Sequence, residues 1–212
     1  MLVPAIKVDI DKKVPSGNLA VMLLAAVTFA VQFRFDSHAW YLNGLVLRHW
    51  SVLPVFGYMW LHMNAPHVIG NLVTLWVFGR KVSTMIGNAL YVLMYVLAGI
   101  GSAIAHVLYD GRPVIGSSGA IMGVFGIYVV VCFTQFGRIG PWLTLLWFLA
   151  TLWAGVVGGF PDAYMSHIGG FLSGLAIGVF LVGFGVVDCR HVDPGLVRLL
   201  RVESSAAAAG RA

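Results

Sequence analysis

The chain has 212 residues, of which 59% are hydrophobic and only 10% are charged. Soluble domains carry about 25% charged residues, so the composition excludes a water-soluble globular protein and indicates an integral membrane protein. The formal net charge of +5 therefore reports on membrane orientation and does not indicate a nucleic-acid-binding surface. The two cysteines, Cys132 and Cys189, indicate neither a disulfide framework nor a metal site.

Apolar segments of membrane-spanning length predict an all-α fold, a six-transmembrane-helix bundle. The polar residues 1–17 are predicted to precede a membrane core at 18–187, and 188–212 to form a disordered tail. Because the first span is short and follows basic residues, a signal peptide ending near Ala30 is an alternative for it. The Trp-containing segment 34–54 is expected to lie in the membrane interface. The predicted spans are 18–33, 55–79, 88–109, 115–135, 141–158 and 164–187.

Basic residues are distributed unevenly between the two sides of such a bundle. With the N-terminus inside, ten of the 13 Lys and Arg fall in inner segments, and only Arg34, Arg48 and Arg112 fall in outer ones. The positive-inside rule therefore predicts cytoplasmic N- and C-termini, in the inner cell membrane. Spans two, four and six then all enter the membrane from its outer side.

These three even-numbered spans carry polar residues at a similar depth, since a helix rises about 1.5 Å per residue. The second contains His62, His67 and Asn71, the fourth contains Ser118, and the sixth opens with His167. Ionisable residues inside spans indicate a functional site. His67 and Asn71 lie one helical turn apart on one face, whereas His62 is expected to point elsewhere and to act on stability or loop order.

Glycines on the fourth and sixth spans indicate that these two helices pack closely. Ser118 and His167 each stand above a stripe of glycines at helical spacing. Taken singly, a glycine stripe is a packing feature and a lone serine bonds to its own helix. Their alignment with the histidines instead predicts contact between Ser118 and His167, supported by the stripes. The stripes are Gly119, Gly123 and Gly126 on one helix and Gly170, Gly174 and Gly178 on the other.

A serine beside a histidine at a helix start permits nucleophilic catalysis, because the imidazole can take the hydroxyl proton. Backbone N–H groups at the start of the fourth span, around Gly116, and the side chains of His67 and Asn71 are candidate donors to an oxyanion. No acidic residue is placed to orient His167. The pattern therefore predicts a Ser118–His167 dyad, without a third member.

The chain resembles the rhomboid family of intramembrane serine proteases, in its bacterial form with a six-span core. The resemblance covers about 18–187. It consists of G-x-S-G at 116–119, a histidine followed by glycines at His167, and H-x(4)-H-x(3)-N from His62 to Asn71. Each motif is weak alone, but the three occur in the right order on the right spans.

The resemblance implies that Ser118 is the nucleophile and His167 the base. It also implies that His67 and Asn71 assist the oxyanion and that His62 braces the preceding loop. The expected activity is hydrolysis of peptide bonds in or near transmembrane segments of other proteins within the bilayer. No cofactor, metal or nucleic acid is expected.

Two positions depart from the family pattern. Met122 stands where an aromatic residue often stacks on the catalytic ring, and a thioether orients a ring less firmly. A glutamate common after the final glycine of the second core span is missing from 79–84. The inner end of that helix is therefore expected to be held in another way.

Other functions remain as alternatives. A zinc protease would need H-E-x-x-H, and an aspartyl protease would need two carboxylates inside spans, whereas Asp110 and Asp162 fall in connections. A small transporter lacks support from any internal repeat or buried carboxylate. A rhomboid-like protein that binds transmembrane segments without cleaving them is the strongest alternative. His106, inside the third span, is interpreted as a buried, hydrogen-bonded histidine.

Overall fold

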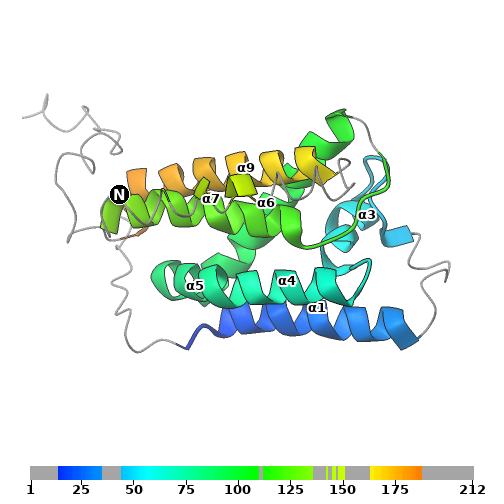
Figure 1. Ribbon diagram of the computed structural model, residues 1–212. Helices are drawn as coiled ribbons and strands as arrows, with labels where there is room; N and C mark the ends of the chain where they lie inside the picture. Colours follow the sequence, from blue (N-terminus) through cyan, green and yellow to red (C-terminus); the bar gives the residue numbers. More distant parts are fainter. Residues whose placement is uncertain are drawn as a thin grey trace, which may run out of the picture.

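The chain forms a helical membrane bundle (Figure 1). Three described helices are long and apolar enough to cross a membrane, namely α1 (Ser16–Arg34), α6 (Asn88–Tyr109) and α9 (Tyr164–Gly183). Helix α7 (Ser118–Gln135) contains a shorter apolar stretch. These helices confirm the predicted all-α membrane fold. The computed structural model describes residues 14–34, 44–109, 112–135, 142, 145, 146, 148–150 and 163–187.

Parts of the predicted organisation lie outside the described residues. These parts are the N-terminal segment up to residue 13, the tail 188–212 and most of the fifth predicted span. The described positions of that span, between 142 and 150, are helical. Among them, Phe148 stacks on Phe171 of α9 with ring centroids 4.1 Å apart. The fifth span therefore contacts the sixth at this position.

The second predicted span is not a single helix over 55–79, and this prediction was wrong. Helix α3 (Val52–Gly57) is followed by a 3-10 turn, η1 (Tyr58–Trp60). The chain then leaves the helical conformation around His62 before α4 (Ala65–Thr74) begins. His62 consequently lies in a connection and not on the helix that carries His67.

Local residues explain where α4 begins. The side-chain oxygen of Asn64 accepts the backbone N–H of His67 at 2.9 Å, and Pro66 occupies the first turn. Both are features of a helix N-terminus. From α4 the helix continues through a short π-helical segment, η2 (Leu75–Gly79), into α5 (Arg80–Ile86).

An asparagine secures the C-terminal end of α5, where the sequence lacks the expected glutamate. The Oδ1 atom of Asn88, at the start of α6, accepts two hydrogen bonds. One comes from the Ser83 hydroxyl at 2.8 Å and the other from the Gly17 backbone N–H at 3.1 Å. Its Nδ2 donates to the carbonyl of Val14 at 3.1 Å. A neutral amide therefore joins this end of the second span to α1 and α6.

A second buried amide supports the π-helical segment. Within η2, the backbone N–H of Arg80 bonds the Leu75 carbonyl five residues back. Asn18 of α1 donates Nδ2 to the same carbonyl at 3.0 Å and accepts the Tyr91 hydroxyl at 2.7 Å. Asn18 is fully buried, so these bonds satisfy its amide.

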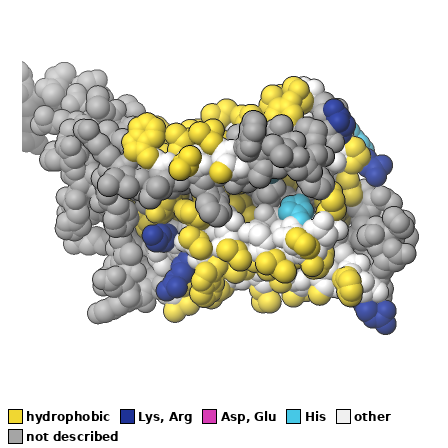
Figure 2. All heavy atoms as spheres, in the orientation of Figure 1, with side chains coloured by type: hydrophobic (Ala, Val, Ile, Leu, Met, Phe, Trp, Pro, Cys, Tyr) yellow, Lys and Arg dark blue, Asp and Glu magenta, His cyan; other side chains and the backbone are white. Residues whose placement is uncertain are grey.

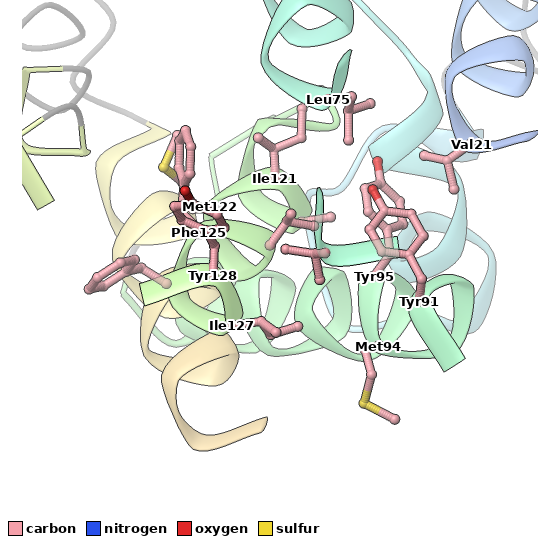
Figure 3. Packing of buried hydrophobic residues seen from close by; sticks show 14 of the residues in the cluster. Val21, Leu75, Tyr91, Met94, Tyr95, Ile121, Met122, Phe125, Ile127 and Tyr128 are labelled. Carbon is pink, nitrogen blue, oxygen red and sulfur yellow. The ribbon is translucent and has the colours of Figure 1, made fainter. Parts of the chain in front are cut away.

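Helix α7 lies inside the bundle, with α9 on one side of it and α4 and α5 on the other in Figure 1. Most of its side chains up to Val131 are buried. Figure 3 shows Phe125 and Tyr128 of α7 in the same hydrophobic cluster as Tyr91 and Tyr95 of α6. This burial explains why α7 is apolar all round and not amphipathic.

The two predicted glycine stripes lie directly against each other. A β-carbon at Gly170 would overlap the carbonyl oxygen of Gly119, and one at Gly174 would overlap that of Gly123. Gly126 similarly faces the backbone of Phe171. Small residues such as glycine allow backbones to approach this closely. This packing sets the position of His167 relative to Ser118.

The close packing predicts a large difference between two glycine-to-alanine changes. We expect Gly174→Ala to lower the melting temperature of the purified protein strongly, because its methyl group would overlap the Gly123 backbone. Gly70→Ala meets nothing within 4 Å, and alanine is the better helix former by about 1 kcal/mol. It should therefore preserve or raise the melting temperature. Equal melting temperatures for the two variants would contradict this account of α7 and α9.

The visible surface fits a lipid environment. Figure 2 shows hydrophobic side chains over most of the described face, with Lys and Arg side chains toward its two ends. Large apolar side chains such as Ile69, Val73 and Trp76 are about half exposed. In the connection predicted to lie in the interface, Trp50 is 59% exposed and Leu47 pairs with Val114 through two backbone hydrogen bonds.

Candidate active site

The candidate site lies at one end of the bundle, where α4, α7 and α9 all begin (Figure 1). The fourth span was predicted to begin at residue 115, but helix α7 begins at Ser118. The delay follows from Gly116, whose φ of 129° is outside the range that helices use. Ser118 therefore occupies the first helical position, where backbone N–H groups lack intrahelical partners.

Ser118 and His167 are brought together across the α7–α9 contact. The Oγ atom of Ser118 lies 2.9 Å from Nε2 of His167. Both residues are partly exposed, so a reacting group can approach the pair. The distance is that of a nucleophile bonded to its base.

A second serine–histidine pair lies next to the first. The Oγ atom of Ser117 is 3.0 Å from Nε2 of His62. Unlike the first pair, Ser117 is 0% and His62 only 2% exposed. A substrate carbonyl has no access to this hydroxyl, so burial distinguishes the two adjacent serines.

The partners of His62 define the roles of its two ring nitrogens. Nδ1 lies 3.2 Å from the carbonyl oxygen of Trp60, which can only accept a hydrogen bond, so Nδ1 carries the proton. In the neutral ring Nε2 then accepts a hydrogen bond from the Ser117 hydroxyl. The expectation that His62 points away from His67 was wrong, since their ring centroids lie 5.2 Å apart in an edge-on contact.

His67 lies near Ser118, and Asn71 follows His67 one turn later on α4. A β-carbon at Gly116 would come within 2.9 Å of His67 Nε2 and 3.6 Å of Ser118 Oγ. Gly116, His67 and Ser118 therefore lie close together. The Nδ2 atom of Asn71 is buried and has no hydrogen-bond partner among the described residues. An unpaired buried donor is costly, and an oxyanion in this place would satisfy it.

Gly116 does not fit the donor role given to it from the sequence. Its backbone N–H is already bonded to the Tyr58 carbonyl at 2.9 Å. A side chain at this position would also collide with the ring of His67. Gly116 therefore contributes space and a left-handed backbone turn, and donors must come from elsewhere.

Two further serines, which the sequence analysis did not identify, lie beneath the dyad. The hydroxyls of Ser102 on α6 and Ser166 on α9 are 2.7 Å apart and buried. A β-carbon at Gly119 would overlap both side chains. Ser166 directly precedes His167, so this bond ties the start of α9 to α6. The one sequence signal that could have identified this pair is that Ser166 directly precedes His167, the predicted base.

Among the described residues, the site contains no carboxylate and no cluster of metal ligands. All eight Asp and Glu lie outside the described residues. Within the described ranges no cluster of three His, Cys, Asp or Glu could hold a metal ion. The chemistry of the described site therefore rests on hydroxyl, imidazole and amide groups.

Two other predicted positions are buried. Met122, one turn after Ser118, is 3% exposed and belongs to the hydrophobic cluster in Figure 3. Its influence on the His167 ring stays a prediction. His106 is fully buried, and its Nε2 donates to the Arg112 carbonyl at 2.7 Å. This agrees with its interpretation as a hydrogen-bonded core histidine, although Nδ1 has no described partner.

Sequence comparisons identify several relatives of this chain. RHOMBOID-like protein 1 of Arabidopsis thaliana is 29% identical over 145 residues, covering 65% of this chain and 37% of that protein. Rhomboid-type serine protease 2 of Emericella nidulans is 30% identical over 126 residues, 57% of this chain and 25% of its own length. Rhomboid protease GluP of Bacillus subtilis is 35% identical over 75 residues, 35% of this chain and 15% of that protein.

The matches therefore span less than half the length of these relatives. In a domain-level comparison residues 49–184, more than half of this chain, match the Rhomboid domain. That range contains the starts of α4, α7 and α9 and every residue of the two serine–histidine pairs. The chain belongs to the rhomboid family.

Proposed function

We propose that this chain is an intramembrane serine endopeptidase that uses a Ser118–His167 dyad. The proposal rests on one observation above all, the 2.9 Å separation of Ser118 Oγ and His167 Nε2 at a partly exposed position. The neighbouring Ser117 has a histidine partner as well, but it is fully buried. Geometry and access together favour Ser118.

In the proposed reaction Nε2 of His167 takes the hydroxyl proton of Ser118 while Oγ attacks a peptide carbonyl carbon. The carbonyl oxygen becomes an oxyanion, which the unpaired Asn71 amide, the His67 ring and N–H groups at the start of α7 stabilise. His167 then gives its proton to the leaving amine as the carbon–nitrogen bond breaks. Water, deprotonated by His167, hydrolyses the acyl-enzyme and restores Ser118.

The proposed substrates are transmembrane segments of other proteins in the bilayer. An extended substrate near the outer ends of α4, α7 and α9 would present its carbonyl to Ser118, and helix-breaking sequence would favour that conformation. The proposed location is the inner cell membrane, with both termini in the cytoplasm. This orientation follows from the ten basic residues assigned to inner segments.

The main alternative is a rhomboid-family protein that binds transmembrane segments without cleaving them. The presence of both dyad residues at hydrogen-bond distance favours an active enzyme. A transporter is less well supported, since no internal repeat relates the two halves of the sequence and no Asp or Glu falls within a predicted span. A cleavage assay separates these functions directly.

The dyad mechanism predicts activity without a metal ion. The purified protein in liposomes should cleave a reporter transmembrane substrate equally well with and without EDTA or phenanthroline. The physical reason is that the proposed steps use only a serine, histidines and an amide. Loss of cleavage under chelation, with recovery on adding zinc, would overturn the mechanism. A folded wild-type protein that cleaves no transmembrane substrate would favour the binding alternative.

A further inference from the structure

A glutamine on α1 makes a two-point contact with the connection that carries His62. The Nε2 atom of Gln32 donates to the His62 carbonyl at 3.2 Å, and its Oε1 accepts the His62 backbone N–H at 2.9 Å. Gln32 is only 7% exposed although it lies near the end of a largely apolar helix. Its amide therefore pairs with one backbone residue as a neighbouring strand would.

This pairing fixes a segment that lies outside the helices. Residues 61–64 connect η1 to α4 without regular structure. Pairing both backbone groups of one residue restrains its position and the direction of its side chain. The ring of His62 also packs edge-on against Phe29, one turn before Gln32 on α1, with centroids 6.5 Å apart. Helix α1 thus holds both the backbone and the ring of His62.

From His62 the contacts lead to both halves of the candidate site. Its Nε2 binds the hydroxyl of Ser117, the residue directly before Ser118. Its ring edge contacts His67, a candidate oxyanion donor on α4. His62 therefore lies between the turn that leads to Ser118 and helix α4, and its own side chain is not accessible to a substrate.

We propose that Gln32, His62 and Ser117 form a positioning unit that holds the oxyanion donors of α4 in register with Ser118. The inference rests on the proposed protease function and deepens it. The unit acts through His67, so its loss should reduce the stabilisation of the transition state more than the binding of substrate. None of the three residues touches the substrate in this role.

The test compares Gln32→Leu with a matched control on the same helix, Asn18→Leu. Both changes remove a buried amide from α1, but Asn18 lies about 20 Å farther inward, at about 1.5 Å per residue. Both should lower the melting temperature. Gln32→Leu should lower kcat by about ten-fold with KM nearly unchanged, as a small misplacement of reacting groups does. Asn18→Leu should leave kcat per folded molecule unchanged.

A milder pair of variants serves if Gln32→Leu fails to fold. Ser117→Ala should lower kcat by about five-fold, the equivalent of one neutral hydrogen bond. Its control is Ser83→Ala, which removes another buried serine whose hydroxyl bonds to a side chain, Asn88, at the inner end. The double variant Gln32→Leu/Ser117→Ala should lose less than the product of the single losses, because both act through His62.

The possible outcomes separate this inference from the function on which it rests. Wild-type cleavage with unchanged kcat in Gln32→Leu or Ser117→Ala would overturn the positioning unit alone. Equal losses of kcat in the test and control variants would also overturn it, since they would indicate general destabilisation. A folded wild type with no cleavage would overturn the proposed function, and the inference with it.

Discussion

Replacing Ser118 by alanine should abolish cleavage of a transmembrane substrate, whereas replacing Ser117 should lower the activity only about five-fold. Loss of the nucleophile removes the covalent step altogether, which in serine proteases costs several orders of magnitude in rate. Ser117 is fully buried and its hydroxyl is bonded to His62, so its loss removes one neutral hydrogen bond. The measurement is the turnover of one reporter substrate, normalised to folded protein.

The two serines provide their own control, because they are neighbours of identical chemistry. Each has a histidine nitrogen within 3.0 Å, and they differ in exposure. An inactive Ser117→Ala beside an active Ser118→Ala would show that the nucleophile is misassigned by one residue. It would also show that burial is a poor guide to access at this site.

The second large effect is expected for the donors on α4. His67→Ala and Asn71→Ala should each lower kcat by about 10²–10³ with little change in melting temperature, because each removes a donor used mainly in the transition state. The unpaired Nδ2 of Asn71 is the clearest structural support for this role. Turnover and thermal melting of the same preparations test the prediction.

His62→Ala serves as the contrasting variant. Its backbone and ring both have buried partners, so we expect a clear loss of stability together with a smaller loss of turnover. Comparable turnover losses in all three variants, with melting unchanged, would mean that His62 acts directly on the reaction. The separation of the donors from the positioning unit would then be wrong.

The contact between Ser118 and His167 was predictable because it depends on local periodicity. Glycines at helical spacing below each residue place both on one face, and the structure packs those faces together. The bounds of α6 (Asn88–Tyr109) match the predicted span for a similar reason. The ends of a long, uniform apolar run indicate where the helix begins and ends. The membrane class followed from composition, and the all-α fold from the length of the apolar segments.

The break before α4 was harder to predict. An asparagine followed by a proline two residues later is a sequence signal of a helix start, but Asn64 and Pro66 follow an apolar run that resembles a continuing span. Because this break was not predicted, His62 was placed on the same helix as His67. Its contacts with Gln32 and Ser117 join residues 30 and 55 positions apart, and no local pattern encodes them.

The central claim is that Ser118 is an activated and accessible nucleophile. The most direct measurement is labelling of the purified, folded protein with a fluorophosphonate probe, followed by mass spectrometry to locate the modified residue. We predict modification at Ser118 in the wild type and in Ser117→Ala, and no labelling of Ser118→Ala. Modification at Ser117, or a folded wild type that takes no label, would contradict the account.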